Sequence, residues 1–345
     1  MTDITNLKKM YRSAVKEEYP SNIRLLIGGK EISLRKIYSL RYGDNPNYPA
    51  ALFAPTPIFK ELKSGKQGLS KINFEDIYRG HVLLRNFSKP ACAYMKHLNP
   101  SGVAIAEGKE TPLRKIIADA RQADSQAAFG ATVGMNVAVD GEAAEELART
   151  YIECISAPDF DDKAQAIFNE KKDLRVVQLP PMTDTKGIDL HFYPEGFATI
   201  SAPYRIGFKD GSNLRVVTKR PPTEREQNDL LFSWTVCAHV RSNAVVVSKH
   251  GCTLGIGTGQ QDRITAARLA VQKPEEAGRR EQLQDAVAAS DGFLPFRDTA
   301  DLLAKYGLTA IIQPGGSMRD QEVIDACDEH GMAMIFTGER CFSHF

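Results

Sequence analysis

The sequence predicts an α/β protein made of two tandem α/β/α modules that are copies of one unit. The first observation is a repeated strand end, because one apolar run terminates in Lys96-His97 and another in Lys249-His250. The second is the order of elements after each pair: a small-residue loop, a helical stretch, and an apolar strand with a proline 61 or 64 residues past the histidine. The third is the length, since 345 residues suit two domains of about 150 residues each. A repeat of this size indicates a duplicated module and not a solenoid, whose units are much shorter.

The first module, 1–190, reads as alternating helices and strands. A Gly-Gly pair between two short apolar runs predicts a hairpin, and Asp140 is placed to cap the helix that comes after it. We expect these elements in order: a helix at 6–18, hairpin strands at 23–27 and 31–34, a strand at 90–95, a helix at 113–123, a strand between 130 and 139, a helix after 140, a strand at 155–158 and a helix-strand unit at 162–177.

Prolines and glycines loosen the pattern between 180 and 222, so we place the module boundary there, with a linker at 191–222. The second module, 223–345, opens on a capping box of Thr223 and Glu226 directly after two prolines. The helix behind it has an apolar face at helical spacing, formed by Leu230, Leu231, Trp234 and Ala238. We expect the module to continue with a strand at 244–248, a helix at 262–270, a strand at 311–314 and a helix-strand unit at 320–336.

The composition argues against several classes of protein. Basic and acidic residues are balanced, 44 against 43, without a basic stripe, so we expect no nucleic-acid partner. The six cysteines are scattered without a CxxC pair, which argues against a disulfide scaffold and a zinc site and suits reduced thiols. The amino terminus lacks the apolar segment of a signal peptide, and no apolar run approaches membrane-spanning length. We therefore expect a soluble, cytoplasmic protein without a membrane partner.

Two adjacent titratable bases at a strand end mark the candidate site. In open α/β sheets, ligands bind where strands end and loops begin, and Lys96 and His97 stand at such a position. A neighbouring ammonium lowers the pKa of an imidazole because it disfavours a second positive charge, so we expect His97 to be neutral, as a general base must be. The alternative is a solvated Lys96 beside a histidine that caps a turn. The pair alone leaves both open.

Several further segments stand in the order found in one enzyme family. They are LRYGDNP at 40–46, KHLNPSG at 96–102, SNA at 242–244, GIGTGQQDR at 255–263, SDGFLPFRD at 290–298 and FTGERCFSH at 336–344. From about residue 35 to the end, the sequence closely resembles AICAR transformylases, the formyltransferase half of bifunctional purine biosynthesis proteins. The resemblance implies two cytidine-deaminase-like modules that arose by duplication and lost the catalytic zinc. The sequence is consistent with that loss, since it has neither the His-x-Glu nor the Pro-Cys-x-x-Cys signature.

The same resemblance implies a formyl transfer. The co-substrate would be 10-formyltetrahydrofolate, the acceptor would be the 5-amine of 5-aminoimidazole-4-carboxamide ribonucleotide (AICAR), and the products would be FAICAR and tetrahydrofolate. His97 would act as general base, Lys96 would face the developing oxyanion, and Asn243 would donate a hydrogen bond to the formyl oxygen. For Asn243 the alternative is a residue at a strand edge that only satisfies a turn. No metal would be required.

Binding residues are implied by the same motifs. Arg41, Arg263 and Arg340 would hold the nucleotide phosphate, because guanidinium forks suit phosphate. Arg263 also comes after a glycine-rich loop at an expected helix N-terminus, which favours anions. The other residues expected at the nucleotide are Tyr42, Phe129, Gly130, Glu153, Phe293 and Phe342. Those expected at the folate are Pro295, Phe296, Asp298 and Ser317. For the aromatic residues the alternative is ordinary core, and Ser317 with Asp320 could equally form only a helix capping box.

The resemblance also implies partners. The family works as a homodimer with shared sites, in which the Arg41 segment comes from the other subunit. The cyclohydrolase domain of the family has no counterpart in this sequence, so we expect a separate IMP cyclohydrolase to close the purine ring. Ser101 stands where the family often has cysteine, which we interpret as a structural position. Two other functions stay open: a catalytically silent AICAR-binding regulator, and a zinc-dependent deaminase on the same scaffold, which the missing ligands disfavour.

Overall fold

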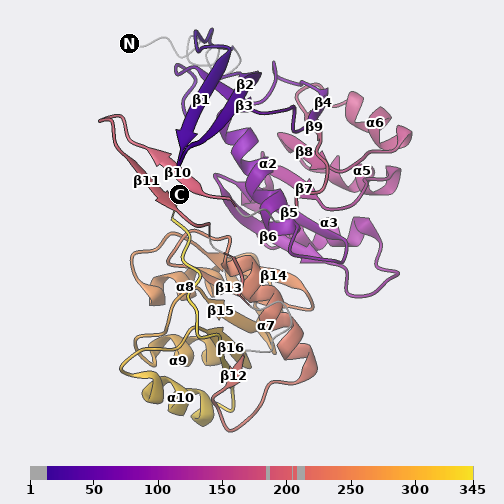
Figure 1. Cartoon of the computed structure of the whole chain (residues 1–345). Coiled ribbons are helices and arrows are strands. Elements are labelled where there is room, and N and C mark those ends of the chain that lie inside the picture. Colours follow the sequence, from indigo (N-terminus) through magenta and orange to yellow (C-terminus); the bar gives the residue numbers. More distant parts are fainter. Residues whose placement is uncertain (1–13, 184–186, 204, 208–213, 345) are drawn as a thin grey trace, which may run out of the picture. The chain divides into compact units, whose positions relative to one another are not determined.

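The computed structural model describes residues 14–183, 187–203, 205–207 and 214–344. This part of the chain forms two compact units (Figure 1). The first contains the described residues up to Arg121 together with Ser125–Pro181, and the second contains Gln122–Asp124 and the described residues from Met182 onward. Each unit packs helices on strands that run both parallel and antiparallel, which confirms the predicted α/β class.

Six strands of the first unit lie side by side. In order they are β6 (Asn99–Ile105), β5 (Ala91–Lys96), β7 (Thr132–Met135), β8 (Cys154–Ala157), β9 (Arg175–Gln178) and β4 (Lys60–Lys63). Strands β7, β8 and β9 are parallel, whereas β5 runs antiparallel to β7. The central strands are short and buried along almost their whole length, as expected for strands covered on both faces.

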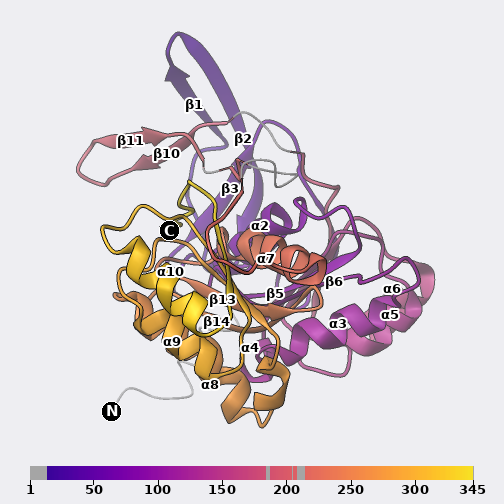
Figure 2. The same ribbon diagram turned by 90° about the horizontal axis from the view of Figure 1, so that it is seen from below.

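Helices cover both faces of these strands. Figure 2 shows α2 (Lys71–Leu84) on one side, and α3 (Leu113–Gln122), α5 (Gly141–Leu147) and α6 (Asp162–Asn169) on the other. The short α4 (Ser125–Ala128) precedes β7. Helix α2 begins at a capping box in which Ser70 and Asn73 satisfy each other's backbone N–H groups. The predicted cap at Asp140 is confirmed, since its side chain accepts from the Ala143 N–H at 2.8 Å.

A separate three-stranded sheet precedes α2, with β1 (Asn22–Ile27), β2 (Lys30–Leu40) and β3 (Ala50–Ala54) in that order. The predicted β1–β2 hairpin is confirmed, and its two turn glycines have positive φ. Leu40 at the end of β2 packs in one core cluster with Leu69 and Ile77, which anchors this sheet beside α2. Of the helix predicted at 6–18, residues 14–18 are irregular and the remainder lies outside the described residues.

The second unit has the same strand order. Across it lie β14 (Cys252–Gly257), β13 (Val245–Lys249), β15 (Val287–Ser290), β16 (Ala310–Gln313), β17 (Ala333–Phe336) and β12 (Arg215–Val216). Again three strands, β15 to β17, are parallel and β13 is antiparallel to its neighbours. Within the predicted linker at 191–222, β12 pairs with β17. A hairpin of β10 (Asp189–Phe192) and β11 (Ala198–Ser201) lies at its start.

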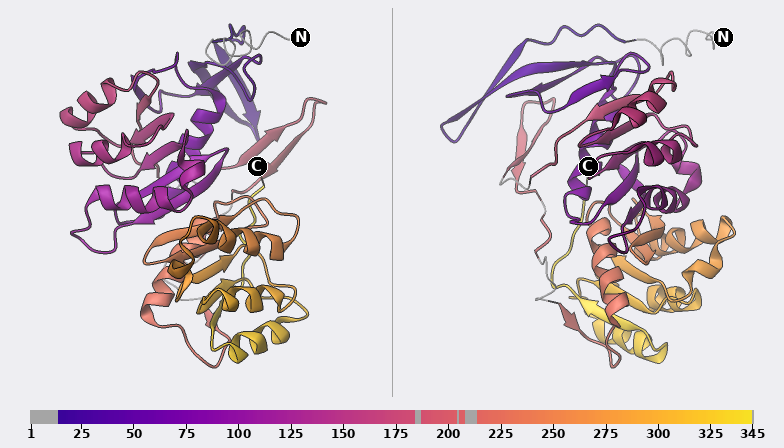
Figure 3. Two further views of the ribbon diagram at one scale, coloured as in Figure 1. Left: turned by 180° about the vertical axis from the view of Figure 1, so that it is seen from behind. Right: turned by 90° about the vertical axis from the view of Figure 1, so that its right-hand side faces the viewer.

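The helices of the second unit also lie on two faces. Helix α7 (Glu224–Cys237) begins at the predicted capping box and buries Leu230 and Trp234 completely. The helices α8 (Arg263–Glu276), α9 (Asp298–Lys305) and α10 (Asp320–Glu329) lie on the other face (Figure 3). Residues of all three belong to one core cluster. A 3-10 turn, η1 (Arg280–Leu283), precedes β15. The two units thus share the order of strands and helices that the sequence repeat predicts.

Both Lys-His pairs lead into the same kind of turn. His97 and Leu98 join β5 to β6 with φ of 52° and 70°. His250 and Gly251 join β13 to β14 with φ of 54° and 65°. Two-residue turns with left-handed central residues match the twist of antiparallel strands. The two histidines therefore occupy the same backbone position in their units.

Candidate functional site

The Lys96-His97 turn ends β5 but lies beside the amino ends of the parallel strands. The last residues of β5 pair with the first of β7, Met95 with Thr132. Strands β8 and β9 start at the same edge because they are parallel to β7. The rule that places ligands beyond the carboxyl ends of parallel strands therefore does not locate this turn.

Hydrogen bonds fix the Lys96-His97 turn to the rest of the first unit, and its histidine is exposed to solvent. Lys96 Nζ donates to the Phe129 carbonyl at 2.6 Å, which fixes the ammonium against the loop before β7. The Leu98 backbone N–H donates to Asp76 Oδ1 at 2.7 Å. His97 is exposed, and among the described residues its ring has no hydrogen-bond partner. An exposed imidazole beside a fixed ammonium suits proton transfer to a ligand better than it suits a turn cap.

Phe129 and Gly130 form an open wall next to Lys96. Gly130 has φ of 75°, and its N–H donates to the Tyr151 carbonyl at 2.7 Å. Phe129 is 60% exposed and packs on the Tyr151 ring with centroids 5.2 Å apart. The exposed ring adds apolar surface next to the Lys96 ammonium. The predicted residues Lys96, His97, Phe129 and Gly130 thus lie together.

Two arginines are buried together in the same unit. Arg41 Nη1 donates to the Lys66 carbonyl at 3.0 Å, and Arg41 Nη2 donates to the Tyr42 hydroxyl at 2.8 Å. Arg175 is fully buried and donates from Nε to the Gly68 carbonyl at 3.1 Å. Burial, and next repulsion from Arg175, lower the pKa of Arg41. Arg41 Nε and Arg175 Nη1 have no hydrogen-bond partner within the described ranges, so the pair has unused donors.

Glu153 is the counter-charge of these arginines. Its Oε2 lies 3.7 Å from Arg175 Nη1, an ion pair too long for a hydrogen bond. The same oxygen accepts from Asn73 Nδ2 at 3.2 Å, which ties it to the start of α2. One carboxylate therefore faces two guanidinium groups, and the excess positive charge suits an anionic ligand.

Lys66 connects the arginine cluster to the aromatic wall. Its Nζ donates to the Tyr151 hydroxyl at 2.7 Å and lies 3.6 Å from Asp173 Oδ2. The loop that carries Lys66 passes close to the start of β9. A Cβ on Gly65, which has φ of 52°, would lie 2.6 Å from the carbonyl oxygens of Asp173 and Leu174. Only glycine fits there, so the loop is fixed by its backbone as well as by the arginines.

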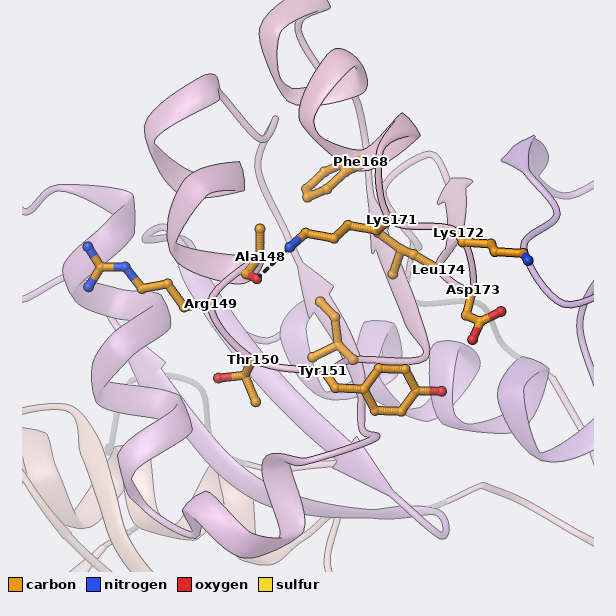
Figure 4. A pocket seen from close by; sticks show the side chains of 10 residues that line it. Ala148, Arg149, Thr150, Tyr151, Phe168, Lys171, Lys172, Asp173 and Leu174 are labelled. Atoms are coloured by element: carbon orange, nitrogen blue, oxygen red, sulfur yellow. Dashed lines mark hydrogen bonds between the residues drawn. The ribbon is translucent and has the colours of Figure 1, made fainter.

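A cavity of about 330 Å³ opens beside Tyr151 (Figure 4). Lys171 Nζ crosses one side of it to reach the Ala148 carbonyl at 3.1 Å. Its charged lining is mainly cationic, formed by Arg149, Lys171, Lys172 and Asp173. The cavity adds room next to the predicted site residues of the first unit.

In the second unit, Arg263 is committed to internal partners. Its Nη1 forms a buried ion pair with Asp291 and donates to the Ala244 carbonyl at 3.2 Å. Its Nη2 donates to Asn243 Oδ1 at 2.7 Å, while Asn243 Nδ2 donates to the Gln260 carbonyl at 2.9 Å. A phosphate role for Arg263 stays a prediction, and it requires the guanidinium to share its donors with Asp291.

The glycine-rich loop before Arg263 does not leave an open anion site. Asp262 is the N-cap of α8, and its carboxylate accepts the Thr265 N–H at 2.8 Å. The end of the helix that was expected to attract an anion therefore already holds a negative charge of the chain itself.

Arg340 and Phe342 complete a second group of predicted residues. The guanidinium carbons of Arg340 and Arg263 lie 4.9 and 5.9 Å from the centroid of the Phe342 ring. A Cβ on Gly292 would lie 2.7 Å from the Phe342 ring, so glycine allows this packing. Phe293 next to it is 46% exposed. Arg340 and Phe293 are therefore exposed beside a half-buried Phe342, whereas Arg263 is buried beneath them.

The residues predicted for the folate lie on neighbouring loops of the second unit. Phe296 is half exposed, and the Arg319 guanidinium stands 4.8 Å from its ring centroid. Pro295 is half-buried, and Asp298 begins α9, where its carboxylate accepts the Thr299 N–H at 2.7 Å. Arg319 thus links Phe296 to the loop that contains Ser317.

Ser317 is not the N-cap of α10. The cap position is Arg319, without a side-chain cap hydrogen bond. Asp320 Oδ1 does accept the Ser317 N–H at 3.1 Å, but the Ser317 hydroxyl accepts the Arg319 N–H at 3.1 Å, too early in the chain for a capping box. The capping alternative is therefore wrong in its boundary, because the helix starts later than the motif indicates.

Sequence reasoning missed five residues of the first-unit cluster, namely Lys66, Asn73, Asp76, Tyr151 and Arg175. Arg175 had a local signal, since it is a charge in a run that otherwise reads as buried strand. Asp76 had a signal in the repeat: it stands 21 residues before His97, as Asp229 stands 21 residues before His250.

Within the described part of the chain, three other features are not found: a metal site, a membrane-spanning helix and a disulfide. There, no three His, Cys, Asp or Glu side chains are gathered so that they could hold a metal ion. None of the helices described combines the length and apolar character that a membrane crossing needs. No disulfide joins the six cysteines, of which five are buried and Cys252 is half-buried.

Comparison with known proteins gives a consistent picture. The family model described as AICARFT/IMPCHase bienzyme matches residues 5–273. The chain is 42% identical over 328 residues to the bifunctional purine biosynthesis protein PurH of Magnetococcus marinus, covering 91% of this chain and 60% of that protein. It is 42% identical to PurH of Aquifex aeolicus, with 92% and 62% covered, and 37% identical to PurH of Oceanobacillus iheyensis, with 97% and 63% covered. The chain thus spans about 60% of the length of these relatives.

Proposed function

Because this chain belongs to the AICARFT/IMPCHase bienzyme family, we propose that it is a folate-dependent formyltransferase of purine biosynthesis. The reaction is the transfer of the formyl group of 10-formyltetrahydrofolate to the 5-amine of AICAR, which gives FAICAR and tetrahydrofolate. The observation that carries the proposal is the first-unit turn, where an exposed His97 stands next to an ammonium fixed on the Phe129 carbonyl.

In the proposed mechanism, the amine nitrogen of AICAR attacks the formyl carbon. His97 takes the proton that this nitrogen loses, and such a base contributes roughly 10²–10⁴ in rate. The carbon–oxygen double bond becomes an oxyanion, which the Lys96 ammonium stabilises with the donors that the Phe129 carbonyl leaves unused. The oxyanion then re-forms the carbon–oxygen double bond as the bond to N10 of the folate breaks, and His97 passes the proton that it took to N10. For Asn243 we keep the role that the family resemblance implies, a hydrogen bond to the formyl oxygen, for which its amide has a second hydrogen, the first being bound to the Gln260 carbonyl.

The nucleotide phosphate is proposed to bind to arginines. Arg41 belongs to a cluster with excess positive charge, and the buried Arg175 joins it in that role. Arg340 is exposed and keeps its fork available while its plane packs near Phe342. Arg263 supports this surface through its ion pair with Asp291. Charge-assisted forks of this kind suit phosphate better than lysine does.

The folate is proposed to bind along the exposed aromatic loops of the second unit. Phe293 and Phe296 leave large apolar surfaces open to a pterin or benzoyl ring. Arg319, which stacks over Phe296, adds a cation for the glutamate carboxylates. Asp298 and Ser317 supply polar groups on the same two loops.

We also propose that the two units are cytidine-deaminase-like modules related by duplication. Their shared strand order, their matching two-residue turns and the equal spacing of Asp76 and Asp229 from the turn histidines support this.

A homodimer is proposed as the working form. The exposed side chains of the β10–β11 hairpin support it, because Phe192, Phe197 and Ile200 are each more than half exposed. That Arg41 comes from the partner subunit, and that a separate cyclohydrolase acts next, stay predictions.

The test is release of tetrahydrofolate by the purified chain, measured by absorbance. The His97→Ala variant is expected to lower kcat by about 10²- to 10⁴-fold, while His250→Ala, its match in the second unit, keeps kcat. Calorimetric titration with AICAR is expected to show binding by both variants. Binding without any turnover by the wild-type chain would favour the silent AICAR-binding regulator instead.

A further inference from the structure

Asp76 is a buried carboxylate directly behind the Lys96-His97 turn. It lies on α2, and its Oδ1 accepts the Leu98 backbone N–H at 2.7 Å. Only 5% of its surface is exposed, so the protein and not water surrounds it. Burial of a charged carboxylate costs free energy unless hydrogen bonds or an opposite charge offset it. The formyl transfer described above assigns it no role.

The turn needs support because its backbone is left-handed. His97 and Leu98 have φ of 52° and 70°. Residues other than glycine, asparagine, aspartate and histidine rarely adopt this region, so the strain falls mainly on Leu98. A hydrogen bond from the Leu98 N–H to a buried carboxylate opposes a return of this residue to ordinary backbone angles.

The second unit makes the same contact in a relaxed form. Asp229 on α7 accepts the Gly251 N–H through Oδ1 at 2.9 Å. The second turn residue there is glycine, which adopts positive φ without steric cost. The contact therefore belongs to both units, but only in the first does it hold a residue with a side chain in a strained conformation.

We propose that Asp76 is a positioning residue that holds the Lys96-His97 turn in the conformation in which imidazole and ammonium act on one substrate. The functional part of this proposal rests on the proposed formyl transfer. Lys96 is fixed from one side by the Phe129 carbonyl, and Asp76 fixes the turn from the other. Holding two reacting groups at a set distance is a main source of rate acceleration.

Asp76 also places a charge that changes with pH behind the turn. The groups that face it are Glu75 and Arg79 on α2, His97 on the turn, and Cys154 on β8. Burial raises the pKa of Asp76 to about 7, and the backbone N–H groups of the turn oppose this rise. The carboxyl group therefore titrates in the range in which a general base works.

The test compares Asp76→Ala with Asp229→Ala, which removes the same hydrogen bond from the other unit. We expect Asp76→Ala to lower kcat by about 10- to 100-fold while KM for AICAR changes less than about threefold. Asp229→Ala is expected to keep kcat within about twofold. Adding Leu98→Gly to Asp76→Ala should restore at least about fivefold in kcat, because glycine accepts the turn without strain.

Hydrogen exchange in the segment 94–99, measured by mass spectrometry, reads the turn without any need for activity. Faster exchange in Asp76→Ala, with the rest of the chain unchanged, supports the proposal. Unchanged exchange there, or an equal fall of kcat in both alanine variants, would overturn it. If the wild-type chain releases no tetrahydrofolate, the proposed function fails, and the exchange data still decide whether Asp76 holds the turn.

Asp76→Asn covers the case in which the alanine variant does not fold. Asparagine keeps the shape and an acceptor oxygen but cannot ionise. We expect the pH profile of kcat to lose a limb near pH 7 that the wild-type chain shows. A pH profile that is the same in both proteins would contradict the proposed effect of the Asp76 charge.

Discussion

Lys96 and Lys249 make the same contact in the two units, but the residue after the contacted carbonyl differs. Lys96 donates to the Phe129 carbonyl at 2.6 Å and Lys249 to the Gln284 carbonyl at 2.7 Å, and these carbonyls lie shortly before β7 and β15. The next residue has positive φ in both units, 75° at Gly130 and 61° at Asp285. Glycine adds no side chain beside Lys96, whereas the second unit has aspartate at this position. This difference supports the proposal that the substrate binds at the first turn.

Alanine at Gly130 tests whether the lack of a side chain there matters for binding. The new Cβ would lie 3.9 Å from Lys96 Nζ and 3.7 Å from Tyr151 Cε1, which are ordinary contacts. The loss of stability should be about 1 kcal/mol, from the positive φ alone. We expect KM for AICAR to rise about tenfold, a loss of about 1.4 kcal/mol in binding. Gly29→Ala, at φ of 80° with no atom within 4 Å, is the control for backbone cost and should keep KM unchanged.

The buried Asp76 should make stability depend on pH in a defined direction. Its pKa is raised from the ordinary 3.8 to about 7. A raised pKa means that the folded protein holds this proton more tightly than the unfolded chain does. The free energy of unfolding therefore includes the full contribution of the protonated carboxyl below about pH 4, and this contribution is lost as the pH rises through about 7. Asp76→Asn removes this loss, so its stability relative to the wild-type chain should improve by up to about 1.4 kcal/mol per pH unit across that window. Urea unfolding at about pH 5 and about pH 8 measures the difference, and a gap that does not change with pH would refute the titration of this group.

At the scale of elements, the loop that carries Lys66 links three parts of the first unit. Its backbone carbonyls accept from Arg41 and Arg175, and the Lys66 side chain reaches Tyr151. Because two guanidinium groups depend on this backbone, the phosphate site proposed here is only as rigid as the loop. Close approach of Gly65 to the start of β9 supplies that rigidity.

Gly65→Ala should loosen the arginine cluster. The added Cβ would lie 2.6 Å from the carbonyl oxygens of Asp173 and Leu174. These are backbone atoms, so the clash can be relieved only if the loop moves. We expect a stability loss of about 2–4 kcal/mol, from overpacking and positive φ together. AICAR affinity, measured by calorimetry below the melting transition, should fall about tenfold. Gly278→Ala is the control, because Gly278 has a similar φ of 68° and no atom near its Cβ position. An equal loss of AICAR affinity in this variant would contradict a specific role of the Gly65 loop.

At the scale of the whole molecule, the order of elements could be predicted because each element has a local signal. Apolar runs predicted β5 and β13, and N-cap residues predicted the helices that begin after Asp140 and Thr223. The repeat then predicted one order for both units, which the matching strand orders support. The predicted helix cap at Ser317 is wrong because the same four residues can also form a turn. In that turn Asp320 accepts the Ser317 N–H, and the Ser317 hydroxyl accepts the Arg319 N–H.

The site was only partly predictable, for a physical reason. Segments such as LRYGDNP and KHLNPSG mark residues that stand near each other in the sequence. The contacts of a buried side chain depend on distant parts of the chain: Arg175 reaches the carbonyl of Gly68, and Asp76 reaches the N–H of Leu98. No local pattern contains such a pairing. The commitment of Arg263 to Asp291 is a further example.

The proposed homodimer makes a prediction for the β10–β11 hairpin. Tyr193 and Phe197 stack there with centroids 4.6 Å apart, and Phe197 is still 57% exposed. Phe197→Asp should shift the chain from dimer to monomer in analytical ultracentrifugation, because it places a charge in an apolar contact. Glu195→Lys on the same hairpin is the control and should leave the dimer intact. A wild-type chain that sediments as an active monomer would remove the proposal.

The cysteines offer a practical opportunity. Burial raises the pKa of Cys154 and of Cys327 to about 12 each, which suppresses the reactive thiolate, and three more are equally enclosed. A maleimide dye should therefore label Cys252 first, at the start of β14 beside the second Lys-His turn. The native sequence thus provides an optical reporter for one unit, with no need for engineered attachment points.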